Sequence, residues 1–138
     1  MSIVEMCDSE AASVSTEATA EQAIRTMLDR RVGAVAVVDE NRRVAGVFTE
    51  RDVLRRLALS GRNPGATPVR EIMTTPVEMA TLATTPAEAL ATMVEQHYRH
   101  LPIVDDDGRL LGMLSIRNVL QAKIDALAAE LDRARSRT

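Results

Sequence analysis

Residues 46–52 read Gly-Val-Phe-Thr-Glu-Arg-Asp, and residues 112–118 read Gly-Met-Leu-Ser-Ile-Arg-Asn, so one pattern occurs twice at a separation of 66 positions. The likeness extends outward from this junction, because residues 3–54 align with residues 69–120 without a gap. Twelve of the aligned positions are identical, which identifies the two segments as copies of one unit. A duplicated unit is typical of two halves that pack about a pseudo-twofold axis and form related clefts between them.

Each copy predicts the same order of secondary structure. Apolar residues at helical spacing follow the predicted N-caps Thr19 and Thr85, and two short apolar runs around an acidic turn then predict a hairpin. The expected helices are 20–31, 50–59, one from Pro86 onward and 116–133; the expected hairpin strands are 34–38, 44–48, 101–104 and 110–114, with further strands around Val14 and around 77–79. The runs are continuously apolar, so both faces of each strand are expected to be covered.

The expected fold is therefore α+β, with two β-α-β-β-α repeats about a pseudo-twofold axis and a C-terminal helical extension. Residues 1–60 form the first repeat, residues 61–68 a linker rich in Gly and Pro, and residues 69–125 the second repeat. Residues 126–138 form the remainder of the last helix and a tail that we expect to be frayed.

The composition excludes several classes of protein. A net charge of −3 and only two aromatic residues argue against nucleic-acid binding. No stretch approaches the roughly 18 apolar residues of a membrane span. The single cysteine, Cys7, fits a reducing compartment, and the acidic N-terminus has no signal-peptide pattern. A soluble cytoplasmic protein is expected.

The repeated junction has the chemistry of an anion site. It leads from a strand to a helix N-terminus, where free N–H groups and the helix dipole favour negative charge. The hydroxyl of Thr49 or Ser115 could bond a phosphate, and the carboxylate of Asp52 could accept the hydroxyls of a ribose. The same residues also form ordinary N-caps, and the pattern alone leaves both interpretations open. Gly46 and Gly112 would allow another backbone or a flat base to come close.

Residues 3–125 resemble a tandem pair of cystathionine β-synthase (CBS) domains, a Bateman module, of the stand-alone bacterial type. The resemblance rests on residues 69–74, 99–105 and 108–112 together with the two junctions. It implies that an adenine nucleotide (AMP, ADP or ATP) or S-adenosylmethionine binds in clefts between the repeats. It also implies that Thr49 and Asp52 form the better site, with phosphate on the hydroxyl and ribose on the carboxylate, and that Ser115 and Asn118 form a second one.

The two copies differ where a ligand would bind. Asn118 replaces the usual Asp, and an amide lacks the charge that strengthens an acceptor. Arg99 and His100 align with Gly33 and Ala34, so only the second copy carries a basic pair. We therefore expect two clefts of unequal strength, and the sequence does not decide which cleft Arg99 and His100 face.

The leading hypothesis is a non-enzymatic sensor module that binds an adenosyl ligand and acts on a separate effector protein. The alternative is a scaffold that dimerises and has no physiological ligand. No acid–base or nucleophile pair supports an enzyme. His97 and His100 lack further metal ligands, so no metal site is expected. Homodimerisation is implied by the resemblance and permitted by an apolar stripe on the last helix, whose members are Val119, Leu120, Ile124, Leu127 and Leu131.

Overall fold

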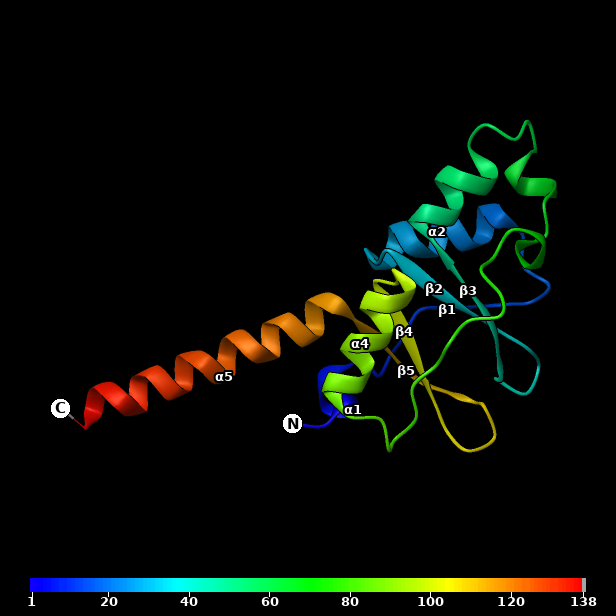
Figure 1. The fold of residues 1–138 in the computed structure, drawn as a ribbon. Coiled ribbons are helices and arrows are strands. Elements are labelled where there is room, and N and C mark those ends of the chain that lie inside the picture. The colour runs from blue at the N-terminus through cyan, green and yellow to red at the C-terminus, as the bar shows by residue number, and fades with distance from the viewer. Residues whose placement is uncertain (138) are drawn as a thin grey trace.

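The computed structural model describes residues 1–137 and contains the two predicted repeats (Figure 1). The first repeat comprises β1 (Ser13–Ser15), α2 (Ala20–Arg30), β2 (Ala34–Val38), β3 (Val44–Thr49), α3 (Glu50–Asp52) and the π-helical η1 (Val53–Leu57). The second comprises α4 (Pro86–Gln96), β4 (His100–Val104), β5 (Leu110–Ser115) and α5 (Ile116–Ser136). A short helix, α1 (Ile3–Met6), precedes them, and two 3₁₀ turns, η2 (Pro64–Ala66) and η3 (Val69–Glu71), connect them. The α+β prediction and the duplication are confirmed.

The predicted caps begin the first helix of each repeat. The Thr19 side chain accepts a hydrogen bond from the backbone N–H of Gln22, whose side chain closes a capping box on α2. At the start of α4 the Thr85 side chain accepts from the backbone N–H of Glu88, and Pro86 stands at the first helical position. Both helices end on a residue in the left-handed conformation, Arg31 in α2 and His97 in α4, at aligned positions. Local sequence therefore fixes both ends of these two helices.

The strands form one sheet of three and one of two. β1 runs parallel to β2, which pairs with β3 in an antiparallel hairpin, and β4 pairs with β5 in the same way. The prediction of a strand around residues 77–79 is wrong, because the chain makes only a single bridge there, between Ala80 and Ile103. Val77 packs instead into the cluster between the repeats, so only Ala80 reaches the edge of β4.

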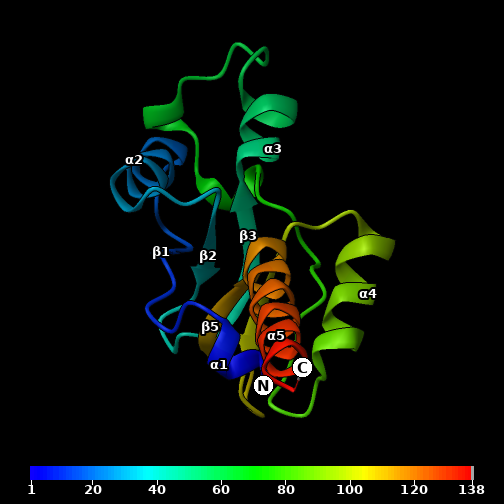
Figure 2. The same ribbon diagram turned by 90° about the vertical axis from the view of Figure 1, so that its left-hand side faces the viewer.

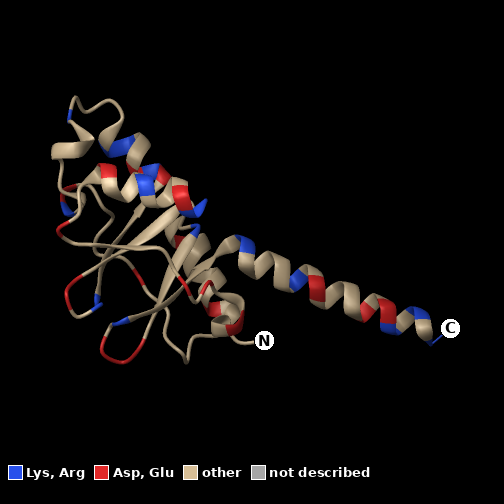
Figure 3. Cartoon of the chain, turned by 180° about the vertical axis from the view of Figure 1, so that it is seen from behind, with Lys and Arg blue, Asp and Glu red and all other residues tan. Residues whose placement is uncertain are grey.

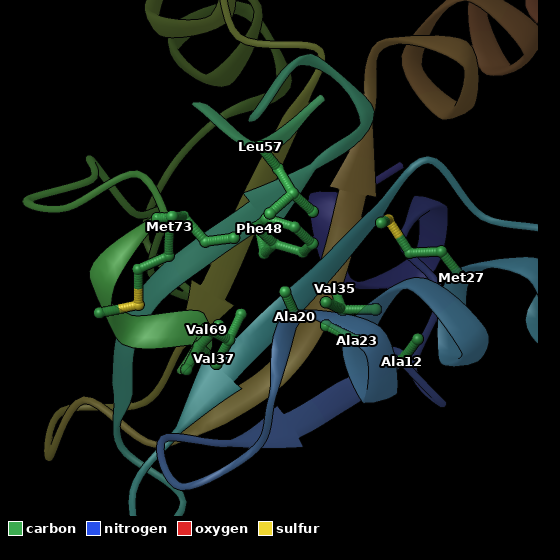
Figure 4. Packing of buried hydrophobic residues seen from close by; sticks show 11 residues of the cluster. Ala12, Ala20, Ala23, Met27, Val35, Val37, Phe48, Leu57, Val69 and Met73 are labelled. Atoms are coloured by element: carbon green, nitrogen blue, oxygen red, sulfur yellow. The ribbon is translucent and has the colours of Figure 1, made fainter. Parts of the chain in front are cut away.

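Strand β2 is buried on both faces, as its unbroken apolar run predicted. Val35 and Val37 lie in the core of the first repeat with Phe48 (Figure 4). Ala34, Ala36 and Val38 lie in a different cluster, which also contains residues of β5 from the second repeat. We call this second set the inter-repeat cluster; its buried members are Ala34, Ala36, Val38, Val47, Leu110 and Met113. The two hairpins therefore pack directly on each other in the middle of the molecule (Figure 2).

The segment that opens each repeat crosses to the hairpin of the other repeat. Thr74 exchanges two backbone hydrogen bonds with Val47, at 2.8 and 3.1 Å, and Asp8 exchanges two with Met113, both at 3.0 Å. These pairs are related by the 66-residue offset, so the exchange is reciprocal. It ties the repeats together with backbone bonds that do not depend on side-chain identity.

Gly46 and Gly112 make these crossings possible. A Cβ on Gly46 would lie 2.7 Å from the carbonyl oxygen of Thr74, and one on Gly112 would lie 3.0 Å from that of Asp8. The first distance is too short for a side chain beside a backbone atom, and the second is so tight that the neighbouring backbone would have to shift by a few tenths of an ångström. The close approach that the sequence suggested is therefore made by another backbone.

We predict that Gly46→Ala destabilises the protein by about 1–3 kcal/mol, because the new methyl group would push the crossing segment away from β3. Gly65→Ala is the matched control, since a Cβ there would meet its nearest atom, Asn63 Oδ1, at an ordinary 3.5 Å. Urea unfolding measures both changes. Equal stability of the two variants would contradict this account of Gly46.

Helix α5 extends further than expected, to Ser136, so the tail predicted to be frayed is helical as far as that residue. Val119 is buried against the second repeat, whereas every described residue from Lys123 to Arg137 is exposed. The helix therefore projects from the body of the molecule (Figure 1). Within residues 1–137 no helix combines the length and apolar character needed to cross a bilayer.

Candidate functional site

A cleft of about 730 Å³ lies between the two repeats, a volume typical of small-molecule sites. The junction of the first repeat forms one wall with Thr49 and Asp52. The end of α4 and the start of β4 form another wall with Arg99 and His100. The full lining is Gly33, Val47, Thr49, Glu50, Arg51, Asp52, Leu54, Arg55, Arg56, Thr74, Val77, Gln96, His97, Tyr98, Arg99 and His100.

Thr49 and Asp52 form a reciprocal cap at the start of α3. The Thr49 hydroxyl oxygen accepts from the backbone N–H of Asp52 at 3.2 Å, and Asp52 Oδ2 accepts from the backbone N–H of Thr49 at 3.0 Å. Asp52 is only 4% exposed. The capping role considered from the sequence is therefore present in the structure, at residues that also line the cleft.

A third residue holds the Asp52 carboxylate from the crossing segment. The Thr74 hydroxyl lies 2.9 Å from Asp52 Oδ1 and 3.1 Å from Oδ2. Arg56 Nε lies 3.8 Å from Oδ1. A carboxylate has about four lone-pair sites, and Oδ1 carries fewer partners than Oδ2, so Oδ1 keeps capacity to accept from a ligand hydroxyl. Sequence reasoning missed Thr74 because it lies 22 residues away from its partner Asp52.

The lining of the cleft carries more positive than negative side chains, although the chain as a whole has a net negative charge. Its lining holds four arginines against the carboxylates of Glu50 and Asp52. Arg51 donates to the carbonyl oxygen of His97 at 3.0 Å, across the boundary between repeats. Arg55 and Arg99 have no recorded partner among the described residues, so both are available to an anion. The arginines other than Arg99 were not predicted as site residues, because their positions on a helix also suit an ordinary exposed surface.

His100 lies beside Glu50 at a point where Gly33 leaves space. A Cβ on Gly33 would be 3.3 Å from the His100 ring and 3.2 Å from the Glu50 carboxylate. Burial lowers the pKa of His100, the nearby charge of Glu50 opposes that shift, and Arg99 adds to it. The imidazole is therefore neutral over a wider pH range than a free histidine. In residues 1–137 no three His, Cys, Asp or Glu side chains gather into a group that could hold a metal ion.

The second junction reproduces the cap but not the surrounding charges. The backbone N–H of Ser115 donates to Asn118 Oδ1 at 2.9 Å, and that of Asn118 donates to Ser115 Oγ at 3.0 Å. At the positions that correspond to Arg55 and Arg56 it carries Gln121 and Ala122. Gly112 lies against Asp8 and Cys7, and Gly46 is absent from the lining of the first cleft. Both glycines therefore serve the crossings between repeats.

The CBS domain profile matches residues 3–59 and 69–125, which are the two repeats described above. The chain belongs to the CBS domain family. A curated relative, the mitochondrial CBS domain-containing protein CBSX3 of Arabidopsis thaliana, is 35% identical over 123 residues, which cover 86% of this chain and 59% of the relative. The chain spans 59% to 66% of the length of the first curated relatives that it matches.

Solved structures of CBS proteins have the same fold. A protein with CBS domains from Burkholderia ambifaria MC40-6 has a TM-score of 0.76 and 35% identity, with 83% of each chain covered. CBSX2, solved in complex with AMP, has a TM-score of 0.78 and 20% identity, covering 90% of this chain and 97% of that one. The pair of CBS repeats is thus a property of both sequence and structure.

We predict that Asp52→Ala lowers the free energy of unfolding by about 1–3 kcal/mol, because the Thr49 N–H and the Thr74 hydroxyl lose a common, buried acceptor. Asp52→Asn should cost less, because an amide oxygen can still accept from the cap, as Asn118 does in the second repeat. Chemical unfolding of both variants checks the order. A larger loss for the asparagine variant would contradict the capping role.

The lowered pKa of His100 predicts a pH dependence of stability. Below about pH 6.5 the unfolded chain binds a proton at this histidine that the folded chain still resists, so stability falls as the pH falls through that range. His100→Gln removes this contribution. Unfolding free energies measured at pH 7.5 and pH 5.5 should therefore differ less in the variant than in the wild type. If the stability of the variant depends on pH as steeply as that of the wild type, or more steeply, then His100 is not the source of this pH dependence.

Proposed function

We propose that the protein is a non-enzymatic regulatory module that binds an adenine nucleotide or a related adenosyl ligand in the cleft between its CBS repeats. One observation carries the proposal: the cleft unites the hydroxyl, the carboxylate and three arginines of the first repeat with Arg99 and His100 of the second. A ligand with a phosphate and a ribose needs both kinds of group. A fold neighbour solved with AMP supports the ligand class, although its sequence is distant.

The residues suggest a division of roles. Arg55 and Arg99 would attract the phosphate, with the Thr49 hydroxyl as a further contact. Asp52 Oδ1 would accept from the ribose, held in place by Thr74. Val47 and Val77 supply apolar surface for the base. AMP, ADP, ATP and S-adenosylmethionine remain candidates, since each combines a cationic or anionic tail with adenosine.

A ligand in this position could transmit a signal because it would contact both repeats. It shifts an equilibrium only if it binds two arrangements unequally. A bound anion would neutralise cations on opposite walls, which favours the closed arrangement over an open one. The response would pass to a separate effector protein. We also propose a cytoplasmic location, on the basis of the single, free Cys7.

A second candidate function is a scaffold without a physiological ligand. It is favoured by apolar side chains that are exposed at aligned positions in both repeats, namely Leu28 with Val94 and Leu54 with Leu120. Exposed apolar residues on matching helices are typical of a surface that another chain covers. We propose that the chain covering this surface is a second copy of the protein. The protein would then be a homodimer under either function.

We predict that adenine nucleotides raise the melting temperature of the wild type, and that Arg55→Ala and Arg99→Ala each weaken binding roughly tenfold. A ligand at a hundredfold excess over its dissociation constant stabilises the fold by about 2.7 kcal/mol. The panel is AMP, ADP, ATP, S-adenosylmethionine and NADH. Neither arginine has a recorded partner, so the ligand-free melting temperature should not change.

Two controls make this experiment decisive. Arg133→Ala removes an exposed arginine of α5 that lies outside the cleft and should leave binding intact. Asp52→Asn tests the ribose contact while keeping the cap. No shift with any ligand, or shifts indifferent to Arg55, Arg99 and Asp52, would favour the scaffold. Reproducible turnover of a nucleotide that disappears in Asp52→Asn would instead indicate an enzyme.

A further inference from the structure

The lining of the cleft contains two acids with different surroundings. The Asp52 carboxylate accepts hydrogen bonds from the Thr49 N–H and the Thr74 hydroxyl. The Glu50 carboxylate is exposed and makes no hydrogen bond or ion pair within residues 1–137. The charge of Glu50 is therefore free to act on whatever occupies the cleft.

The start of the helix does not account for an acid at position 50. The helix dipole favours an acid in the first turn, but Asp52 already supplies one in α3. The aligned residue of the second repeat is Ile116, and α5 begins without any acid in its first turn. Other acidic residues gather at the tips of the two hairpins, the end of β3 that is remote from Glu50 (red in Figure 3). The reason for Glu50 is therefore sought within the cleft.

Glu50 marks the boundary between the cleft and an apolar groove of the first repeat. Three residues line both spaces, namely Gly33, Glu50 and Leu54. The groove lies between α2 and η1, and the rest of its lining is Ile24, Met27, Leu28, Arg31, Val32 and Val53. Of these lining residues only Arg31 is positively charged. A ligand tail that extended past Glu50 would therefore leave the arginines of the cleft for a mainly apolar surface.

The second repeat meets Glu50 at the same boundary. From a Cβ built on Gly33, Glu50 Oε1 lies at 3.2 Å and His100 Cε1 at 3.3 Å, so the two side chains approach each other over Gly33. Burial lowers the pKa of His100, and at pH 7.5 its imidazole leaves the Glu50 charge uncompensated. Arg99 lines the cleft but not the groove. The positive charge of the second repeat thus stays on the cleft side of Glu50.

We propose that Glu50 limits the ligand of the cleft to a nucleoside monophosphate. The inference rests on the proposed function and narrows its ligand class. The four arginines of the lining outnumber its two carboxylates by two, which matches the charge of about −1.5 to −2 on a phosphate monoester at neutral pH. Without Glu50 the excess would be three, which suits a longer phosphate chain.

The order of groups along the chain places Glu50 where a longer tail would go. Thr49 is the proposed phosphate contact, and Glu50 directly follows it, on the side of the groove. Each further phosphate would bring negative charge toward an acid and away from Arg99. S-adenosylmethionine would instead bring the positive charge of its sulfonium among the arginines. Both kinds of ligand should therefore bind less tightly than AMP.

Titration of the wild type and of Glu50→Gln with AMP and ATP tests the proposal. Calorimetry at pH 7.5 and low salt, with EDTA present, avoids screening of the exposed charge and neutralisation of the phosphates by a divalent cation. The wild type should bind AMP roughly tenfold more tightly than ATP. Glu50→Gln keeps the shape of the side chain, and it should strengthen ATP binding roughly tenfold but AMP binding less than about threefold.

Two control variants separate the position of the charge from its mere presence. Glu50→Asp retains the carboxylate and should keep the preference for AMP. Glu95→Gln removes an exposed acid of α4 that lines neither the cleft nor the groove, and it should leave both affinities unchanged. Melting temperatures without ligand verify that each variant is folded.

The outcomes distinguish this inference from the proposed function. A wild type that binds ATP as tightly as AMP, or more tightly, would overturn the inference. A Glu50→Gln variant that keeps the AMP:ATP affinity ratio of the wild type would overturn it as well. In both cases AMP still binds, so the proposed function stands. If neither nucleotide binds the wild type, the proposed function fails and the role of Glu50 fails with it.

Discussion

The reciprocal crossing of the two repeats is the constraint on which the rest of the structure depends. Thr74 bonds to Val47 of the first hairpin, and Asp8 bonds to Met113 of the second, through backbone atoms alone. These bonds hold the two hairpins back to back, so that the alanine face of β2 can be buried. Without the crossings each repeat would expose that face, because a single hairpin with its helices has only one covered side. Duplication therefore supplies the second half of the core.

The cleft follows from the same geometry. The crossing segment carries the Thr74 hydroxyl to the start of α3, where it bonds to Asp52. Packing of the hairpins also brings the beginning of β4 beside Gly33, which places His100 and Glu50 together. Neither repeat alone contains both the hydroxyl and carboxylate wall and the Arg99 wall. A change that altered the packing between repeats would thus alter the cleft, which is the physical basis for coupling a ligand to shape.

Much of this fold was predictable because its signals are local. The caps Thr19 and Thr85 begin α2 and α4, and unbroken apolar runs identify the buried hairpins. The candidate junction was likewise visible, since Thr49 and Asp52 are three residues apart. The partner Thr74, the free Arg55 and the wall to which Arg99 belongs were not predictable. Each depends on which segments the tertiary fold brings together, and the expected strand near 77–79 failed because packing of Val77 prevailed over local β propensity.

The two repeats are alike in the glycines, crossings and caps that form their common frame, but they differ in the residues that line the cleft. This difference has a physical reason. The glycines, the crossings and the caps occur in both, because the glycines and crossings maintain contact with the other repeat and the caps begin the helices. At the positions that line the cleft the aligned residues differ: Asp52 corresponds to Asn118, Thr74 to Asp8, and Arg99 to Gly33. In the first repeat the helix carries the acid, Asp52, and the crossing segment opposite it carries the neutral hydroxyl of Thr74. In the second repeat the helix carries the neutral amide of Asn118, and the crossing segment carries the acid, Asp8. An acid on the crossing segment lacks the cap that holds Asp52 in place, and Asp8 bonds instead to the backbone N–H of Glu10. The frame is therefore symmetric, whereas the arrangement that we propose for a ribose and a phosphate occurs at the first junction and not at the second, so the proposal calls for one ligand in each chain.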